Sequence, residues 1–202
     1  MMKNKGMLLI LSGPSGSGKD TVIAELFKTD FNLVQSLSMT TRAPRNEEKN
    51  GVDYLFVDRD FFENAIENGE MLEYMQYGSN YYGTPKAPID NWVNEGKTVI
   101  LKIDIKGFDN VKRLYPESVS IFLSPPDMQV LEKRLRRRGT ESEESVKTRL
   151  NIAVNEMKKI PEYDYLVIND ELGKAVEEIK TILSAEALRV CRRNISEVIG
   201  NV

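Results

Sequence analysis

The sequence predicts an α/β fold with a parallel sheet at its core. Short, continuous apolar runs of the kind found in buried strands recur along the chain, at 7–11, 98–104, 118–124 and 163–169. Helical patterns separate these runs, and strands that alternate with helices indicate right-handed crossovers. A glycine-rich stretch, 13–21, follows the first run directly and leads into the first helical pattern.

The size and composition of the chain limit the functions that it can have. With 202 residues, of which 41% are apolar, the chain suits one α/β unit with a proper core. The net charge is −3, from 28 basic and 31 acidic residues, which argues against an overall nucleic-acid-binding surface. Because the chain has no histidine, histidine bases and histidine metal ligands are excluded, and any metal would be a hard cation held by oxygen atoms.

Nothing in the sequence predicts a membrane protein or an exported protein. Cys191 is the single cysteine, so no intrachain disulfide can form. The apolar run near the N-terminus stops at Ser12, and we interpret it as a buried strand and not as a signal peptide. No stretch is long enough to cross a bilayer. We therefore expect a cytoplasmic protein with no membrane partner and no nucleic-acid partner, and the sequence leaves the oligomeric state open, a homodimer included.

The first helix and the middle of the chain differ in character. Apolar residues at 22, 23, 26 and 27 have a helical spacing and predict a helix over 19–28. The segment 36–96 is richer in tyrosine, asparagine, glycine and threonine, and it contains short strand candidates at 53–57 and 71–83. We interpret this segment as an inserted, partly β subdomain.

The C-terminal part of the chain returns to the alternating pattern. Helical patterns cover 125–139 and 145–160, and a run of charged residues at 134–149 joins them. The tail after about residue 187 continues a helical pattern. We expect this tail to be a helix that packs on the core or on a partner.

The glycine-rich stretch reads GPSGSGKDT and matches most of the phosphate-loop pattern, G-x-x-x-x-G-K followed by Ser or Thr. Its glycines allow the backbone to curl so that several N–H groups point inward, and the helix that begins near Lys19 adds its positive end. Because a strand precedes the loop and a helix follows it, we predict an ATP phosphate site in which Lys19 reaches the β and γ phosphates. The predicted residues are Gly13, Pro14, Ser15, Gly16, Ser17, Gly18, Lys19, Asp20 and Thr21.

Asp20 stands where the pattern has a hydroxyl that helps to hold Mg²⁺ with ATP. Thr21, one residue later, can supply a hydroxyl instead. The carboxylate of Asp20 suits a hard cation, which it would reach directly or through water. Since a carboxylate close to phosphate is repelled by it, we expect Asp20 to have a positively charged partner.

Several segments together resemble guanylate kinases in order and spacing, over roughly residues 6–188. They read LSGPSGSGKDT, SLSMTTRAPRNEEKNGVDYLFV, EYMQYGSNYYGTP, KIDIKG, RRRGTESEESVKTRL and VIND. The resemblance implies a P-loop nucleoside monophosphate kinase fold that transfers the γ-phosphoryl group of ATP to GMP and yields ADP and GDP. It also implies a core at 6–35, 97–133 and 150–188, a GMP-binding subdomain at 36–96, a lid at 134–149 and a C-terminal helical tail at 189–202.

The resemblance implies that GMP binds in the inserted subdomain. The matching phosphate contacts are Arg42, Arg45, Tyr54 and Tyr82. The matching guanine contacts are Ser38, Glu73, Thr84 and Asp104. Two arginine forks and two hydroxyls suit a monophosphate dianion. Guanine presents N1–H and an amino group side by side, and one carboxylate accepts both, so we expect Glu73 to select guanine over adenine.

By the same resemblance, the segment 134–149 is a lid that closes on ATP and on the moving phosphoryl group. The matching arginines are Arg134, Arg138 and Arg149. Asn169 matches a position near the adenine. The residues that we expect to carry catalysis are Lys19, Arg42, Arg138 and Arg149. They would act by positioning and charge stabilisation, without a general base, because the GMP phosphate is already an anionic nucleophile.

Three positions depart from the family pattern, namely Asp20, Lys102 in place of a strand acid, and Lys106 in place of a common glutamine. Because that strand ends beside the first helical turn after the loop, we predict that Asp20 and Lys102 face each other as an exchanged pair. Asp20→Ser alone should then be more harmful than Asp20→Ser combined with Lys102→Asp. The departures leave two alternatives open, a catalytically silent binding module and a kinase with a different acceptor.

Overall fold

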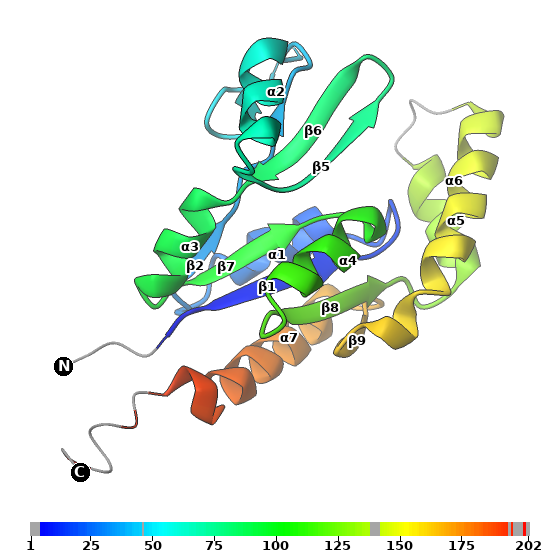
Figure 1. Cartoon of the computed structure of the whole chain (residues 1–202). Helices are drawn as coiled ribbons and strands as arrows, with labels where there is room; N and C mark the ends of the chain where they lie inside the picture. Colours follow the sequence, from blue (N-terminus) through cyan, green and yellow to red (C-terminus); the bar gives the residue numbers. More distant parts are fainter. Residues whose placement is uncertain (1–4, 46, 138–141, 194, 196–199, 201–202) are drawn as a thin grey trace.

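A parallel sheet of five strands forms the core of the protein. The computed structural model describes residues 5–45, 47–137, 142–193, 195 and 200, except for the side chain of Lys106. The sheet has the order β2-β7-β1-β8-β9, and its neighbouring strands are parallel (Figure 1). The strands are β1 (Met7–Ser12), β2 (Leu33–Gln35), β7 (Thr98–Lys102), β8 (Val119–Ser124) and β9 (Tyr165–Ile168). The predicted fold class is therefore confirmed.

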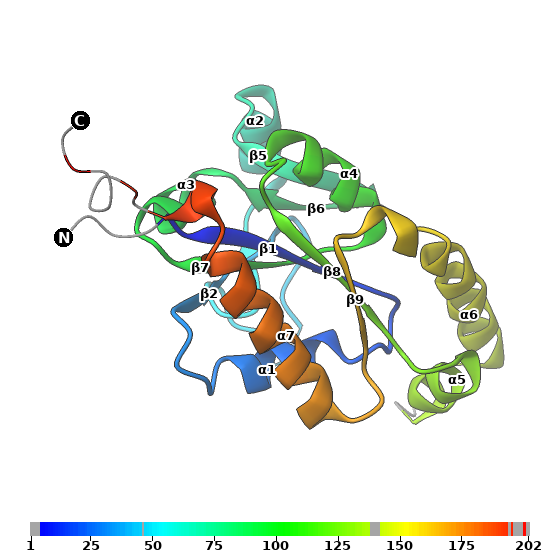
Figure 2. The same cartoon turned by 90° about the horizontal axis from the view of Figure 1, so that it is seen from below.

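Helices cover both faces of this sheet (Figure 2). Helices α1 (Lys19–Leu26) and α7 (Leu172–Ala187) pack on one face. Helices α3 (Ala87–Asn94) and α4 (Ile105–Leu114) pack on the other. With helices on both sides, the strands are buried on both faces, which explains why they read as continuous apolar runs in the sequence.

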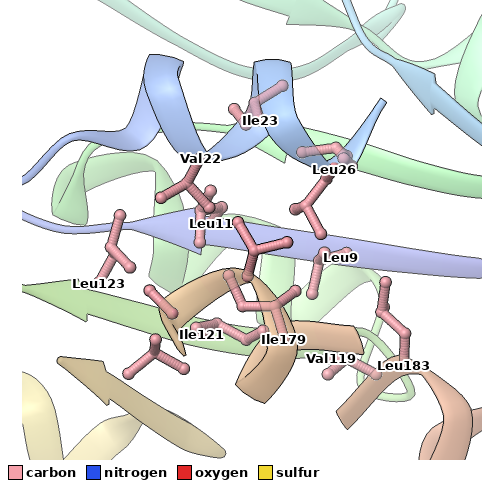
Figure 3. Close-up of a cluster of buried hydrophobic side chains, with 14 of the residues drawn as sticks. Leu9, Leu11, Val22, Ile23, Leu26, Val119, Ile121, Leu123, Ile179 and Leu183 are labelled. Carbon is pink, nitrogen blue, oxygen red and sulfur yellow. The ribbon is translucent and has the colours of Figure 1, made fainter. Parts of the chain in front are cut away.

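Side chains that alternate along β1 build a separate hydrophobic cluster on each face. Leu9 and Leu11 lie with Val22 of α1 and Ile179 of α7 in the cluster that Figure 3 shows. Ile10 points to the opposite cluster, beneath α3 and α4. All five side chains are fully buried, so truncating one of the large ones to alanine costs about 2–5 kcal/mol. This packing fixes the carboxyl ends of the strands, where the candidate site lies.

The inserted segment forms a second, smaller sheet with the order β4-β3-β6-β5, drawn above the core in Figure 1. Its strands are β3 (Met39–Thr40), β4 (Leu55–Phe56), β5 (Met71–Tyr77) and β6 (Asn80–Pro85). The turn between β5 and β6 contains Gly78 at a φ of 61°, which glycine adopts without strain. Helix α2 (Arg59–Glu67) packs on this sheet through Phe62, and the Asp58 carboxylate caps its first turn.

Two helices contain most of the described part of the predicted lid. Helix α5 (Met128–Arg136) and helix α6 (Glu143–Met157) pack together through Leu131, Leu135 and Ala153. The segments 134–137 and 142–149 are thus largely helical. In the part of the chain that the structure describes, neither these helices nor any other is long and apolar enough to cross a bilayer.

The last helix of the segment 36–96 belongs to the core packing. Helix α3 contacts β1 and β7 of the large sheet, and its buried Ile89 lies in a core cluster. The smaller sheet itself ends with β6 at Pro85. Within the segment 36–96, α3 thus follows the smaller sheet and packs on the larger one.

The C-terminal tail does not continue the last helix as expected. Helix α7 ends at Ala187, and the described residues beyond it contain a single 3₁₀ turn, Val190–Arg192. Arg192 is buried in this turn. Its guanidinium donates to the Glu117 carbonyl oxygen at 2.7 Å and lies 3.4 Å from the Glu186 carboxylate, and these contacts hold the chain in the turn. Such a buried polar anchor has no signature in the hydrophobic spacing. The helical tail predicted over 189–202 is corrected accordingly for the described residues.

Candidate active site

The glycine-rich loop joins β1 to α1 at the carboxyl edge of the large sheet. Its glycines Gly13, Gly16 and Gly18 have φ angles of 146°, 91° and 95°, which residues with side chains rarely adopt. A Cβ atom on Gly18 would also lie 2.4 Å from the Asn169 amide nitrogen. The Lys19 ammonium donates to the carbonyl oxygens of Gly13 (2.5 Å) and Pro14 (3.1 Å). The loop therefore has the predicted curled form, with Lys19 folded over it.

Two further residues of the predicted ATP site, Asn169 and Arg134, form hydrogen bonds that hold this loop in place. The buried Asn169 amide donates to the Ser17 carbonyl oxygen at 2.7 Å. Arg134 of α5 donates to the carbonyl oxygen of Asn169 at 2.7 Å and to that of Ser17 at 3.5 Å. Arg134, Asn169 and Thr21 also line a cavity of about 310 Å³ beside the loop. The structure thus brings these predicted residues together.

One of the predicted lid arginines, Arg149, reaches the other side of the loop. Arg149 of α6 donates to the Ser15 hydroxyl at 3.2 Å, and the two residues line a cavity of about 560 Å³. A guanidinium therefore stands at the mouth of the phosphate loop. Arg138 lies outside the residues that the structure describes, so its catalytic role stays a prediction.

The predicted exchanged pair, Asp20 with Lys102, is confirmed. Lys102 ends β7, and its ammonium donates to Asp20 Oδ1 at 2.6 Å. The sheet register explains the contact, because Lys102 is aligned with Leu11 of β1, just before the loop. The side chains of Lys102 and Asp20 are 37% and 75% exposed, so the pair adds at most about 1 kcal/mol to stability. Its main consequence is local, since Lys102 offsets the negative charge of Asp20 next to the phosphate loop.

The oxygen donors near the loop suit a hard cation. Within the described ranges there is no cluster of three or more histidine, cysteine or acidic residues that could hold a metal by itself. The exposed Asp20 carboxylate and Thr21 hydroxyl lie in the first turn of α1. One or two protein oxygens of this kind fit Mg²⁺, which keeps several waters and binds substrate phosphates as its other ligands.

Most of the predicted GMP residues meet in a cavity of about 170 Å³ between the two sheets. Its walls come from β5, β6 and the end of β7, and from the predicted set they include Ser38, Tyr54, Glu73, Tyr82 and Asp104. The structure brings these residues together from segments that are far apart in the sequence.

Glu73 is held in one orientation at the wall of this cavity. The fully buried Thr84 donates to Glu73 Oε1 at 2.6 Å. A Cβ atom on Gly107 would come within 3.2 Å of Glu73 Oε2, so a glycine at this position leaves room for the carboxylate. Burial raises the pKa of Glu73, the Thr84 hydrogen bond lowers this pKa, and the nearby Asp104 charge raises it. A ligand that donates hydrogen bonds to this half-buried carboxylate would be favoured.

Arg42 forms a bidentate ion pair with Glu48, and neither residue is among those that line the cavity. Its Nη1 and Nη2 atoms donate to Glu48 Oε2 and Oε1 at 2.8 and 2.9 Å, and the Arg45 backbone N–H donates to Oε2 at 2.8 Å. The guanidinium also lies 5.5 Å from the ring centre of Tyr54. The hydrogen bonds between Arg42 and Glu48 raise the pKa of Arg42 and lower the pKa of Glu48. Glu48 therefore occupies the edge of Arg42 that carries Nη1 and Nη2, and Arg45 keeps an exposed side chain.

Two carboxylates of the site, Glu48 and Glu156, were not predicted from the sequence. Glu156 of α6 lines both the cavity next to Ser15 and a neighbouring cavity next to Tyr82. Its Oε2 is buried without a hydrogen-bond partner among the described residues, and burial raises its pKa although the charge of Lys19 opposes this. Neither residue carries a signal in the sequence, because Glu48 lies in a charged loop and Glu156 in an ordinary helical pattern.

Comparisons with known proteins agree with this arrangement. The guanylate kinase family model matches residues 5–186. Guanylate kinases of Lactobacillus johnsonii and Lactobacillus acidophilus are 47% and 48% identical to this chain over 192 residues, which cover 95% of this chain and 94% of each relative. A crystal structure of guanylate kinase from Anaplasma phagocytophilum matches with a TM-score of 0.78 and 34% identity, over 98% of this chain and 95% of that one. The chain therefore belongs to the guanylate kinase family.

Proposed function

We propose that this protein is a guanylate kinase that transfers the γ-phosphoryl group of ATP to GMP and releases ADP and GDP. The observation that carries this proposal is the placement of two sites at one edge of the large sheet. The phosphate loop ends at Lys19, and the cavity that contains Glu73 is partly walled by the end of β7 at the same edge. Lys102 lines that cavity and contacts Asp20 beside the loop, so a donor and an acceptor would meet there.

On the donor side, the loop N–H groups and the N-terminal end of α1 would bind the ATP phosphates. Lys19 would exchange its carbonyl partners for the β and γ phosphates. Arg134 and Asn169 hold the loop in shape and line the cavity beside it. Arg149, together with Arg138, would stabilise the charge that spreads over the oxygens of the moving phosphoryl group.

On the acceptor side, the guanine base would bind against Glu73. The carboxylate would accept hydrogen bonds from guanine N1–H and from the 2-amino group, while Thr84 keeps the carboxylate in place. Ser38 and Asp104 line the same cavity and complete the polar contacts to the base. Adenine has an acceptor at N1 and would turn a lone pair toward Glu73, so it is expected to bind poorly.

The phosphate of GMP would bind to Arg42, Arg45, Tyr54 and Tyr82. Arg42 already offers a fork that is occupied by the Glu48 carboxylate, a group with the same charge sign and planar oxygen pair. The phosphate would take over that fork, and bidentate arginine binding is well suited to phosphate oxygens. Tyr54 and Tyr82, whose ring centres are 6.3 Å apart, would donate from their hydroxyls.

In the reaction, an oxygen of the GMP phosphate attacks the γ-phosphorus of ATP, and the bond from that phosphorus to the bridging oxygen of ADP breaks. The nucleophile is already anionic, so no base has to remove a proton, in agreement with the absence of histidine. Mg²⁺ bound with ATP would neutralise charge on the β and γ phosphates. Thr21 and Asp20 would hold it, directly or through water.

Neither alternative is favoured over the kinase. A silent binding module has no need of Lys19 folded into an intact phosphate loop, and a kinase for another acceptor has no need of a guanine-selective Glu73. A cytoplasmic location, a role in purine nucleotide metabolism and the lack of nucleic-acid and membrane partners are part of the proposal. A homodimer is compatible with it.

The direct test is to identify the products. The protein is incubated with ATP, Mg²⁺ and GMP, and the nucleotides are separated by anion-exchange chromatography. We expect ADP and GDP in equal amounts. Lys19→Met should abolish this turnover and retain GMP binding, whereas the matched control Lys28→Met, at an exposed lysine beyond α1, should have no effect. Formation of ADP without GDP would contradict the proposal.

A further inference from the structure

Lys102 lies between the phosphate loop and the cavity that contains Glu73. It is the last residue of β7, and its ammonium lies 2.6 Å from Asp20 Oδ1 in the first turn of α1, directly after the phosphate loop. The same side chain lines the acceptor cavity together with Tyr54 and Tyr82. The ammonium of Lys102 therefore stands where the space for the donor phosphates adjoins the space for the acceptor.

The charges around the acceptor cavity make this cation important. The described residues that line the cavity include two carboxylates, Glu73 and Asp104, and Lys102 is the one cation among them. Arg42 is engaged by Glu48 and is not among the lining residues. A phosphate dianion that enters this cavity therefore meets negative charge on the base side and finds its nearest counter-charge in the lining at Lys102.

We propose that Lys102 is a further catalytic residue, whose ammonium contacts the phosphate of GMP while Asp20 holds it in position. An ammonium has three donors, so it can bond to Asp20 and to a phosphate oxygen at the same time. Asp20 is then a positioning residue, and the exchanged pair places a cation at the meeting point of the two phosphates. This inference rests on the proposed function, because it names a contact within the GMP site.

The test compares GMP with guanosine, which has the same base and no phosphate. Binding of each to the full-length protein is measured by calorimetry without ATP, for the wild type and for Lys102→Met. Loss of a charge-assisted hydrogen bond should weaken GMP binding roughly tenfold to a hundredfold. Guanosine binding should stay within about twofold of wild type, since the base contacts are unchanged. The matched control is Lys112→Met, which removes an ammonium that also lies 2.6 Å from a carboxylate, that of Asp164, but lines no part of this cavity.

Other outcomes would overturn the inference. Equal weakening of GMP and guanosine would show that Lys102 supports the shape of the cavity. Unchanged GMP binding with weakened ATP binding would show that Lys102 acts only through Asp20 on the donor side. Lys102→Arg, which keeps the charge, should recover most of the GMP affinity, and failure to do so in a variant with the wild-type melting temperature would also contradict it. The proposed function has its own control, because wild-type turnover of GMP is measured separately.

Discussion

The most informative single substitution is Glu73→Gln, which tests how the acceptor cavity recognises guanine. Glu73 Oε1 accepts from the buried Thr84 hydroxyl at 2.6 Å, and the glutamine carbonyl can keep that bond. The amide group then presents an N–H where the carboxylate presents an acceptor. The substitution therefore preserves shape and volume and changes only charge and hydrogen-bond polarity.

The expected loss follows from the two hydrogen bonds that guanine donates. Each bond to a charged acceptor contributes about 1.5–3 kcal/mol. With the amide, one of these bonds is lost and a donor of guanine faces another donor. We expect GMP binding to weaken by about 3 kcal/mol, which corresponds to roughly a hundredfold increase in Kd.

Titration calorimetry without ATP measures this change for GMP and for guanosine. Both should weaken by the same factor, because the substitution affects the base and not the phosphate, and ATP affinity should not change. The matched control is Glu70→Gln, at an exposed glutamate just before β5, which should bind GMP like the wild type. A Glu73→Gln protein with GMP affinity within about threefold of wild type would refute this account of guanine recognition.

Three further predictions concern acidity, the loop and the exchanged pair. Burial raises the pKa of Glu73 above the usual glutamate range and guanine needs the ionised form, so guanosine affinity should fall as the pH drops through that raised pKa. Calorimetry at several pH values should find no such dependence in Glu73→Gln. Gly18→Ala puts a side chain at a φ of 95° and 2.4 Å from Asn169 Nδ2. The substitution should therefore destabilise the protein by about 1–3 kcal/mol and weaken ATP binding. An unchanged Kd for ATP would argue against the described geometry of the loop. In urea unfolding, the Asp20→Ser protein should have a lower free energy of unfolding than the protein with both Asp20→Ser and Lys102→Asp. The reason is that the new carboxylate on the strand can accept a hydrogen bond from the new hydroxyl, and the difference should stay below about 1 kcal/mol. The opposite order of stability would contradict the exchange of the two residues.

The parts of the molecule that the sequence predicted well are those with strong local signals. The core strands read as apolar runs because helices cover them on both faces, and the loop between β1 and α1 follows from its glycines and Lys19. The Asp20–Lys102 contact was predictable because both residues sit at the same edge of a parallel sheet.

The parts that were missed depend on contacts between distant segments. Glu48 engages Arg42 through a loop whose shape has no periodic signal, and Glu156 lines two cavities of the site because the fold places α6 beside Ser15 and Tyr82. The turn at Arg192 depends on a carbonyl oxygen at Glu117, far away in the chain. The roles of such side chains cannot be predicted from local sequence, because their partners lie in other segments that only the fold brings into contact.

We propose that the phosphate loop and the Glu73 cavity act together on ATP and GMP. The initial rate of ADP release with ATP, Mg²⁺ and each of GMP, AMP, CMP and UMP shows whether both sites take part in one reaction. We predict strong turnover with GMP and little with the other three. No turnover with any acceptor by a protein that still binds GMP, or equal rates with GMP and AMP, would contradict a GMP-specific kinase.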